Sequence, residues 1–162
     1  MKTKLLLLIT VLIIGISSKV QAYDFSAVAP SGQTLYYNII SSNTAEVTCE
    51  LLYYPFYNTC PAGNLKIPDS ILFNGNYFYV TSIANATFQD CTNLSSVIIP
   101  NRVTSIGNSA FFGCSSLTSV IIPNSVTLIG NSVFTYCSNL SSVSISNSLS
   151  TISFEAFSYC TS

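Results

Sequence analysis

SVIIPNRVTSIGNSAFFGC, residues 96–114, is followed 23 positions later by the nearly identical stretch SVIIPNSVTLIGNSVFTYC, residues 119–137. The two stretches share their apolar residues, a Pro-Asn turn, an Ile-Gly-Asn triplet and a final cysteine. Aligning the chain on itself gives three full copies, residues 94–116, 117–139 and 140–162. A fixed step of this length is typical of a repeat stack, in which one copy cannot bury its apolar side alone.

The alternation of residues within one copy predicts a short strand. Leu117, Val120 and Ile122 are expected to point inward, and Thr118, Ser119 and Ile121 outward. A proline ends the strand because it cannot donate to a ladder. Residues that recur with the repeat predict core columns, and we expect Phe111, Phe134 and Phe157 to be buried in one column beside Ile106, Ile129 and Ile152.

The second half of a copy predicts a corner and a short helix. Gly130 suits a corner with positive φ. Asn131 can then cap a single helical turn, whose Phe134 and Cys137 fill the core. Successive coils are expected about 4.8 Å apart, the strand spacing of a parallel sheet.

Residues 1–22 read as a secretory signal peptide. Lys2 and Lys4 precede an apolar run from residue 5 to residue 16, and Val20-Gln21-Ala22 gives a small-residue cleavage pattern. The apolar run is too short to span a bilayer, and no later segment is long and apolar enough to do so. We therefore expect a protein that is secreted or held at the cell surface, in the periplasm or outside the cell.

Residues 23–70 are predicted to form an N-terminal β cap, followed by repeats over residues 71–162. The stretch LYYNIISSNTAEVTCELLYY, residues 35–54, has two β-prone runs around a Ser-Ser-Asn turn. The stretch ILFNGNYFYV, residues 71–80, contains Asn74-Gly75, a favoured two-residue hairpin turn. Lys66-Ile67-Pro68 resembles the end of a degenerate repeat strand. Hairpins of this kind can cover the first coil of a stack.

The composition argues against several classes of function. Removing the leader leaves two basic residues, Lys66 and Arg102, against six acidic ones, a formal net charge of −4. Such a surface lacks the basic patch that nucleic acid or anionic lipid requires. The chain has no histidine, its acidic residues are scattered, and no serine lies in a G-x-S-x-G elbow. We expect neither an enzyme nor a bound metal or cofactor.

Six cysteines in a secreted chain suggest disulfides. Four of them, Cys91, Cys114, Cys137 and Cys160, occupy one repeat position, and we expect them to pack as buried thiols because parallel Cβ vectors suit a bridge poorly. Cys49 and Cys60 lie outside the period and flank a short aromatic loop. A bridge between Cys49 and Cys60 is possible in an oxidising compartment, and free thiols there are the alternative.

The spaced residues from Val80 to Ser162 resemble the frame of BspA-like (Treponema-type) leucine-rich repeats, L-x-x-[VI]-x-[IL]-P…[VL]-x-x-I-G-x-x-A-F-x-x-C. The resemblance implies a leucine-rich repeat solenoid, a parallel β-strand stack with short helical turns, behind an antiparallel β-hairpin cap. Two departures stand out. The asparagine ladder of common leucine-rich repeats is absent, its place taken by the Pro turn, and Ser146 and Ser153 replace the proline and glycine in the third copy.

A broad, uncharged face is the candidate contact surface. It comprises outward strand residues and aromatic residues near the turns: Thr118, Ser119, Ile121, Phe112, Tyr136 and Tyr159. A merely solvated face is the alternative. The resemblance favours a non-catalytic, adhesin-like interaction module, because BspA-like proteins include surface proteins that bind host matrix components or other cells. Its partner would be an extracellular protein or a glycan.

Two other functions remain open. Tyr-rich hairpins in the cap favour a carbohydrate-binding module, and a structural spacer is the third possibility. We expect the last coil to leave one face uncovered. Either a longer repeat array or self-association through this C-terminal end would cover that face.

Overall fold

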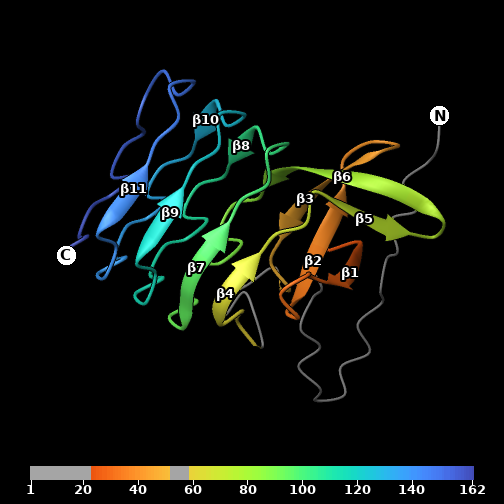
Figure 1. The fold of residues 1–162 in the computed structure, drawn as a ribbon, viewed down its shortest axis with the longest axis horizontal. Coiled ribbons are helices and arrows are strands. Elements are labelled where there is room, and N and C mark those ends of the chain that lie inside the picture. The colour runs from red at the N-terminus through yellow and green to blue at the C-terminus, as the bar shows by residue number, and fades with distance from the viewer. Residues whose placement is uncertain (1–22, 52–58) are drawn as a thin grey trace, which may run out of the picture.

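The computed structural model of the chain describes residues 23–51 and 59–162. The predicted signal peptide lies outside these residues. Within them the strands form two sheets that run along one stack (Figure 1). The larger sheet has the order β1-β2-β3-β6-β8-β10, with β5 paired to β6, and the smaller one has the order β11-β9-β7-β4.

The two antiparallel hairpins predicted in the first part of the chain form, and an additional strand extends the first of them. β1 (Phe25–Val28), β2 (Thr34–Ile39) and β3 (Thr44–Thr48) make a meander. β5 (Ser70–Phe73) and β6 (Asn76–Ile83) pair around Asn74-Gly75. Both turn residues have positive φ, 49° and 77°, as a two-residue hairpin turn of the primed type requires.

The cap and the repeats share their sheets. β3 pairs with β6 in parallel, and β6 pairs in turn with the repeat strand β8 (Ser105–Ile106). β4 (Gly63–Lys66), which precedes the boundary predicted near residue 70, already pairs in parallel with β7 (Leu94–Ile98). The hairpin β5–β6 is therefore an insertion within the first coil of the stack.

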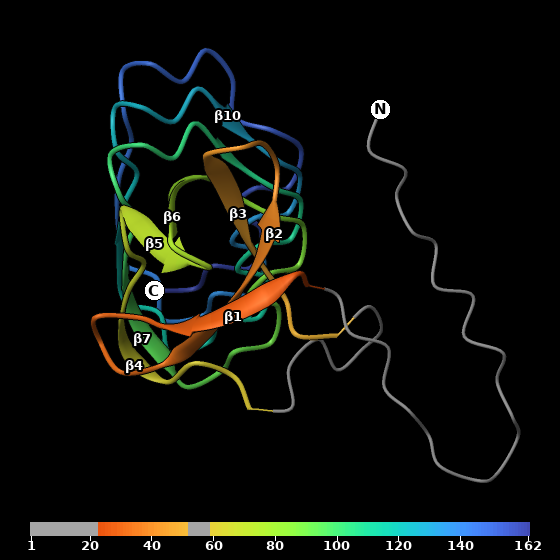
Figure 2. The same ribbon diagram turned by 90° about the vertical axis from the view of Figure 1, so that its right-hand side faces the viewer.

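Strands from successive repeats pair in parallel. β9 (Ser119–Ile121) lies between β7 and β11 (Ser142–Ser144), and Ser119 is the partner of both Ser96 and Ser142. On the other side, β10 (Leu128–Ile129) pairs with β8. The coils superpose in a view along the stack (Figure 2). The predicted facing is confirmed: Leu117, Val120 and Ile122 are buried, and Thr118, Ser119 and Ile121 are exposed.

The phenylalanine column holds the centre of the stack. Phe88, Phe111 and Phe134 have no exposed surface, and each ring stacks on the next at 5.2 and 5.4 Å between centroids. Phe157 continues the column at 5.4 Å but is only half-buried. Ile106 and Ile129 are 1% exposed, as expected. The prediction is wrong for Ile152, which is 57% exposed, because residues 151–153 form no strand over the last coil.

The predicted helical turns do not form, and no helix occurs in the described ranges. Two residues per coil have positive φ, among them Ser132 (54°) and Tyr136 (61°), which ends any right-handed helical run between them. The N–H groups donate instead to the next coil: Phe111 N to Val133 O at 2.9 Å and Phe134 N to Ala156 O at 2.8 Å. Hydrogen bonds between coils thus replace those of a helix.

The Ile-Gly-Asn triplet also differs from its prediction. Gly130 does not have positive φ; a Cβ there would lie 2.4 Å from the backbone nitrogen of Asn108. Asn131 does not cap a helix. Its N–H donates to Oδ1 of Asn108 at 2.8 Å, just as Asn108 N–H donates to Oδ1 of Asn85 at 2.7 Å. The glycine therefore permits a close approach between coils, and the asparagines form a ladder of their own.

Candidate functional site

The predicted contact residues on the strand lie on the outward side of the sheet β4-β7-β9-β11, which we call the outer face. Its most exposed apolar residues are Ile98 and Ile121, at 59% and 69%. They are direct partners on β7 and β9, and the same row has Lys66 on β4 and Ser144 on β11. A neighbouring row consists of Asn64, Ser96, Ser119 and Ser142. The outer face is thus apolar in its middle, with uncharged polar residues around it and one charged residue, Lys66, on the β4 side.

Some hydroxyl groups of this face bind within the stack. Thr118 Oγ1 donates to Ser95 O at 3.4 Å, and Ser141 Oγ donates to Thr118 O at 3.3 Å. Ser96 Oγ donates to Asn64 Oδ1 at 2.8 Å. These hydroxyls bind neighbouring coils, so Thr118 contributes less to a contact surface than the sequence indicates.

A shallow hollow adjoins the outer face where the strands end at the Pro-Asn turns. It has a volume of about 410 Å³, and its lining includes Ile98, Ile121, Ile145, Asn101 and Asn124. The apolar row and this hollow together offer a continuous surface for a partner.

The predicted aromatic residues form a second row on the turn segments. Phe112 meets Tyr136 edge to face at 5.3 Å, and Tyr136 stacks on Tyr159 at 4.6 Å with an interplanar angle of 6°. Tyr136 and Tyr159 are 48% and 63% exposed. The stacking covers one face of each tyrosine ring, and Phe112 packs against Tyr136, so the aromatic faces of this row are only partly available to a partner.

The tyrosines of the cap divide into buried and exposed ones. Tyr77 and Tyr79 on β6 are exposed, and the guanidinium of Arg102 lies 4.3 Å from the ring centre of Tyr79. Tyr37 is buried, with its ring stacked on Phe25, and burial raises the pKa of its phenol well above the usual value. Its hydroxyl finds no hydrogen-bond partner among the described residues.

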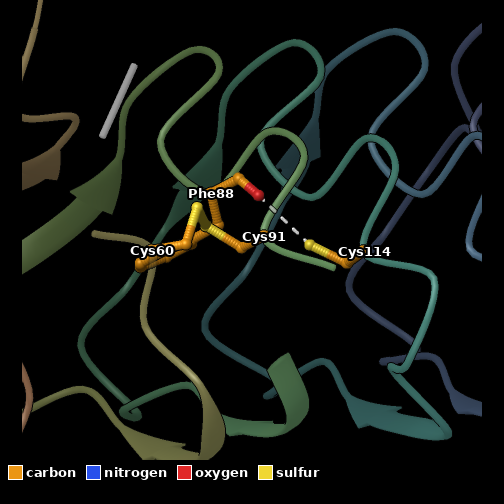
Figure 3. Close-up of a disulfide and its surroundings, with 4 residues drawn as sticks. All are labelled: Cys60, Phe88, Cys91 and Cys114. Atoms are coloured by element: carbon orange, nitrogen blue, oxygen red, sulfur yellow. Dashed lines mark hydrogen bonds between the residues drawn. A yellow bond between two sulfur atoms is a disulfide. The ribbon is translucent and has the colours of Figure 1, made fainter. Parts of the chain in front are cut away.

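The disulfide prediction for Cys49 and Cys60 is wrong. Cys60 is bridged to Cys91, with their Cα atoms 5.2 Å apart (Figure 3). Cys49 is a buried free thiol whose Sγ donates to Leu51 O at 3.0 Å. The two bridged residues are 31 positions apart because the hairpin β5–β6 is inserted between them. Cys60 therefore occupies the position before Cys91 in the cysteine column, and Cys91 is not the free thiol that we expected.

The remaining cysteines of the column are free thiols, as predicted. Cys114 Sγ donates to Phe88 O at 3.1 Å (Figure 3). Cys137 Sγ donates to Phe111 O at the same distance, so each thiol binds one coil back. Burial, with a smaller contribution from Cys160, raises the pKa of Cys137 to about 12. Burial raises the pKa of the Cys114 thiol as well. Such thiols are poor nucleophiles at neutral pH.

No group of three or more His, Cys, Asp or Glu side chains that could hold a metal ion occurs within residues 23–51 and 59–162. A helix long and apolar enough to cross a membrane is likewise absent from these ranges.

A groove on the larger sheet escaped the sequence analysis. It has a volume of about 520 Å³ and lies between an outward row on β3, β6, β8 and β10 and the asparagine ladder. The outward row comprises Glu46, Ser82, Ser105 and Leu128. The signal that could have found it is the Asn85, Asn108 and Asn131 series, which recurs with the repeat but was interpreted as a helix cap.

The comparisons with known proteins agree with this architecture. The profile of a family described as "BspA type Leucine rich repeat region (6 copies)" matches residues 50–162. The crystal structure of a leucine-rich repeat protein from Bacteroides capillosus has a TM-score of 0.61 at 26% identity, covering 74% of this chain and 83% of that one. No curated protein shows a significant similarity to the chain.

Two more distant structures show the same fold. A leucine rich repeat protein of Treponema pallidum has a TM-score of 0.57 at 22% identity, covering 78% of this chain and 64% of its own. The pneumococcal vaccine antigen PcpA has a TM-score of 0.50 at 21% identity, covering 88% of this chain and 42% of its own. The chain thus spans most of the Bacteroides protein and a smaller share of the other two.

Proposed function

Because the chain belongs to the BspA-type leucine rich repeat family, we propose that it is a non-catalytic protein-interaction module, adhesin-like, that works in the secreted or surface-bound state. The observation that carries the proposal is the outer face. Ile98 and Ile121 lie side by side there, 59% and 69% exposed, beside a hollow of about 410 Å³. An apolar centre with a polar rim is the composition of many interfaces.

The geometry supports binding of a large partner. The strands of the outer face run parallel in register, so its rows extend over four strands as one surface. No Asp or Glu lies in the rows of Ile98 and Ser96, and Lys66 is the one charged residue in them. Shape and apolar burial would therefore determine affinity, with electrostatic steering playing a small part.

A location outside the cytoplasm agrees with the predicted leader in residues 1–22 and with the disulfide between Cys60 and Cys91. One protein of the same fold is a vaccine antigen, with which display at a surface would agree.

Substituting the exposed isoleucines tests the proposal. The double variant Ile98→Ser/Ile121→Ser places at both positions the residue that the third coil has naturally at Ser144, so the fold should tolerate it. Binding of the purified protein to immobilised extracellular-matrix proteins and to whole cells would be measured by surface plasmon resonance and flow cytometry. We expect a loss of at least tenfold in affinity, about 1.4 kcal/mol or more.

Leu72→Ser is the matched control. Leu72 is 58% exposed, similar to Ile98, but lies on β5 of the other sheet. Its substitution removes the same kind of exposed apolar side chain and should leave binding intact. Equal binding by the double variant and the control, or no binding by the wild-type protein to any of these surfaces, would refute the proposal.

A further inference from the structure

The groove on the larger sheet has one wall built from a row of strand residues. Glu46 on β3 is the partner of Ser82 on β6, Ser82 of Ser105 on β8, and Ser105 of Leu128 on β10. All four line the groove. The row begins in the cap and continues along the stack, so the groove is long in the direction of the stack axis.

The opposite wall is the asparagine ladder. Oδ1 of Asn85 accepts the N–H of Asn108, and Oδ1 of Asn108 accepts that of Asn131, which fixes which end of each amide is oxygen. All three side chains are exposed. None of their Nδ2 groups donates to another residue of the described chain. The ladder thus presents a line of oriented N–H donors. The Nδ2 groups of Asn85 and Asn108 are held in place because Oδ1 of the same amide accepts a hydrogen bond.

The floor between the walls has no side chains at two positions. Gly107 and Gly130 line the groove, and a Cβ at Gly107 would lie 2.6 Å from both the backbone nitrogen and Oδ1 of Asn85. Because they have no side chains, the glycines allow the hydrogen bonds of the asparagine ladder to form and leave the floor of the groove free of side-chain atoms. The donors are preorganised, which reduces the entropy lost when a ligand binds.

The charges of the lining argue against an anionic ligand. No Lys or Arg lines the groove, so phosphate, sulfate or carboxylate groups would find no counter-charge. Its single carboxylate, Glu46, is oriented by a hydrogen bond of 3.1 Å from Asn38 Nδ2 and can accept from a hydroxyl. Amide donors, serine hydroxyls, one carboxylate and the exposed side of Leu128 together suit a molecule with many hydroxyl groups and apolar C–H faces.

The spacing of the donors separates a glycan from a peptide. Successive coils are about 4.8 Å apart, so the ladder offers a donor at about that step. An extended peptide directs carbonyls to one side about every 6.6 Å, twice the rise per residue, and so falls out of step. One pyranose unit with its linkage is close to a single coil step in length. We propose that this groove binds a neutral linear oligosaccharide that lies along the stack.

This site is separate from the outer face, so its test is independent of the proposed protein partner. The probe would be an array of neutral linear hexasaccharides of glucose, xylose, galactose and mannose. A sulfated hexasaccharide and an uncharged octapeptide would serve as comparisons. We expect at least one neutral hexasaccharide to bind, and its affinity would then be measured by isothermal titration calorimetry.

Asn108→Asp is the decisive variant. Aspartate keeps an oxygen to accept the N–H of Asn131, so the ladder remains, but it removes the outward N–H donor. We expect at least a tenfold loss of hexasaccharide affinity with little change in melting temperature. Ser105→Ala, which removes one hydroxyl and no ladder bond, should cost a smaller factor, about threefold. Asn147→Asp makes the same chemical change at an exposed position outside the groove and should bind as the wild type does.

Three results would overturn the proposal. The first is that no neutral hexasaccharide binds. The second is that Asn108→Asp binds as tightly as Asn147→Asp. The third is that the sulfated sugar or the peptide binds at least as well as any neutral hexasaccharide.

Discussion

Replacing Gly130 with alanine tests how closely neighbouring coils must approach each other. The added Cβ would lie 2.4 Å from the backbone nitrogen of Asn108, 2.5 Å from its Oδ1 and 2.7 Å from its Cα. Backbone atoms cannot rotate away as the end of a side chain can. The two coils must therefore separate, and the 2.8 Å hydrogen bond from Asn131 N to Asn108 Oδ1 must stretch or break.

The magnitude follows from three contributions to the free energy of unfolding. Overpacking at a rigid contact costs about 1–3 kcal/mol. Loss of the ladder bond costs about 1 kcal/mol. Alanine restores about 0.4–1 kcal/mol by restricting the unfolded chain, because Gly130 does not have positive φ. The net destabilisation is about 1–3.5 kcal/mol, which for a domain of this size lowers the melting temperature by roughly 3–14 °C.

Thermal and urea denaturation followed by circular dichroism would measure this loss. Gly113→Asn is the control, because Gly113 has a φ of 70° but its equivalents in other coils are Asp90, Tyr136 and Tyr159, so this position tolerates side chains. Its new Cβ would meet only the carboxylate end of Asp90, which can move. We expect the control to lose less than about 1 kcal/mol. A Gly130→Ala protein that melts within 2 °C of wild type, or a control that loses as much, would refute the close-approach argument.

Three further predictions concern the core. Phe134→Ala should destabilise the protein by about 3–5 kcal/mol and Phe157→Ala by clearly less. Of these two residues, Phe134 is the one that is stacked on both sides and has no exposed surface. Equal losses of unfolding free energy in urea denaturation would contradict this. Peptide mapping without reductant should find Cys60 linked to Cys91, and removing Cys60 should cost about 3–4 kcal/mol by releasing the closed loop. Because the pKa of Cys137 is raised to about 12, about one Cys137 thiol in ten thousand is ionised at pH 8, and the native protein should resist iodoacetamide there. Mass spectrometry should find Cys137 modified only on unfolding or at higher pH.

The features that the sequence predicts well are those that neighbouring residues determine. The facing of Leu117 and Val120 follows from the two-residue period of a strand, and the pairing of β5 with β6 follows from Asn74-Gly75. The phenylalanine column follows from the repeat itself, because equivalent residues must stack when coils stack. None of these inferences needs the distance between coils.

The features that the sequence missed depend on contacts between coils. Asn131 followed by an apolar run has the local pattern of a helix cap, but Phe134 N–H binds Ala156 O of the next coil. Gly130 was explained by its backbone freedom, whereas the structure uses its small size. In both cases a contact between residues in different repeats overrides a reasonable local preference.

The cysteine pairing failed for a related reason. The hairpin β5–β6 shifts Cys60 out of the sequence period while leaving it in the column, because an insertion that leaves and returns at the same place does not disturb the stack. The argument that equivalent cysteines pair poorly also failed at this junction. The pairing of β4 with β7 shifts register between Gly63 and Asn64, so the segment containing Cys60 does not repeat the geometry of the later coils.

The third copy shows what the Ile-Gly-Asn triplet contributes, because the chain has Ile152-Ser153-Phe154 there. In the earlier copies the glycine N–H binds the isoleucine carbonyl one coil back, as from Gly130 N to Ile106 O at 2.8 Å. In the third copy the hydroxyl of Ser153 donates a hydrogen bond to the equivalent carbonyl, Ile129 O, at 2.6 Å. Ile152 is then 57% exposed, although Ala156 in the same terminal coil is 2% exposed. We infer that the burial of this isoleucine depends on the glycine that follows it, since only a residue without a side chain lets the backbone reach the preceding coil.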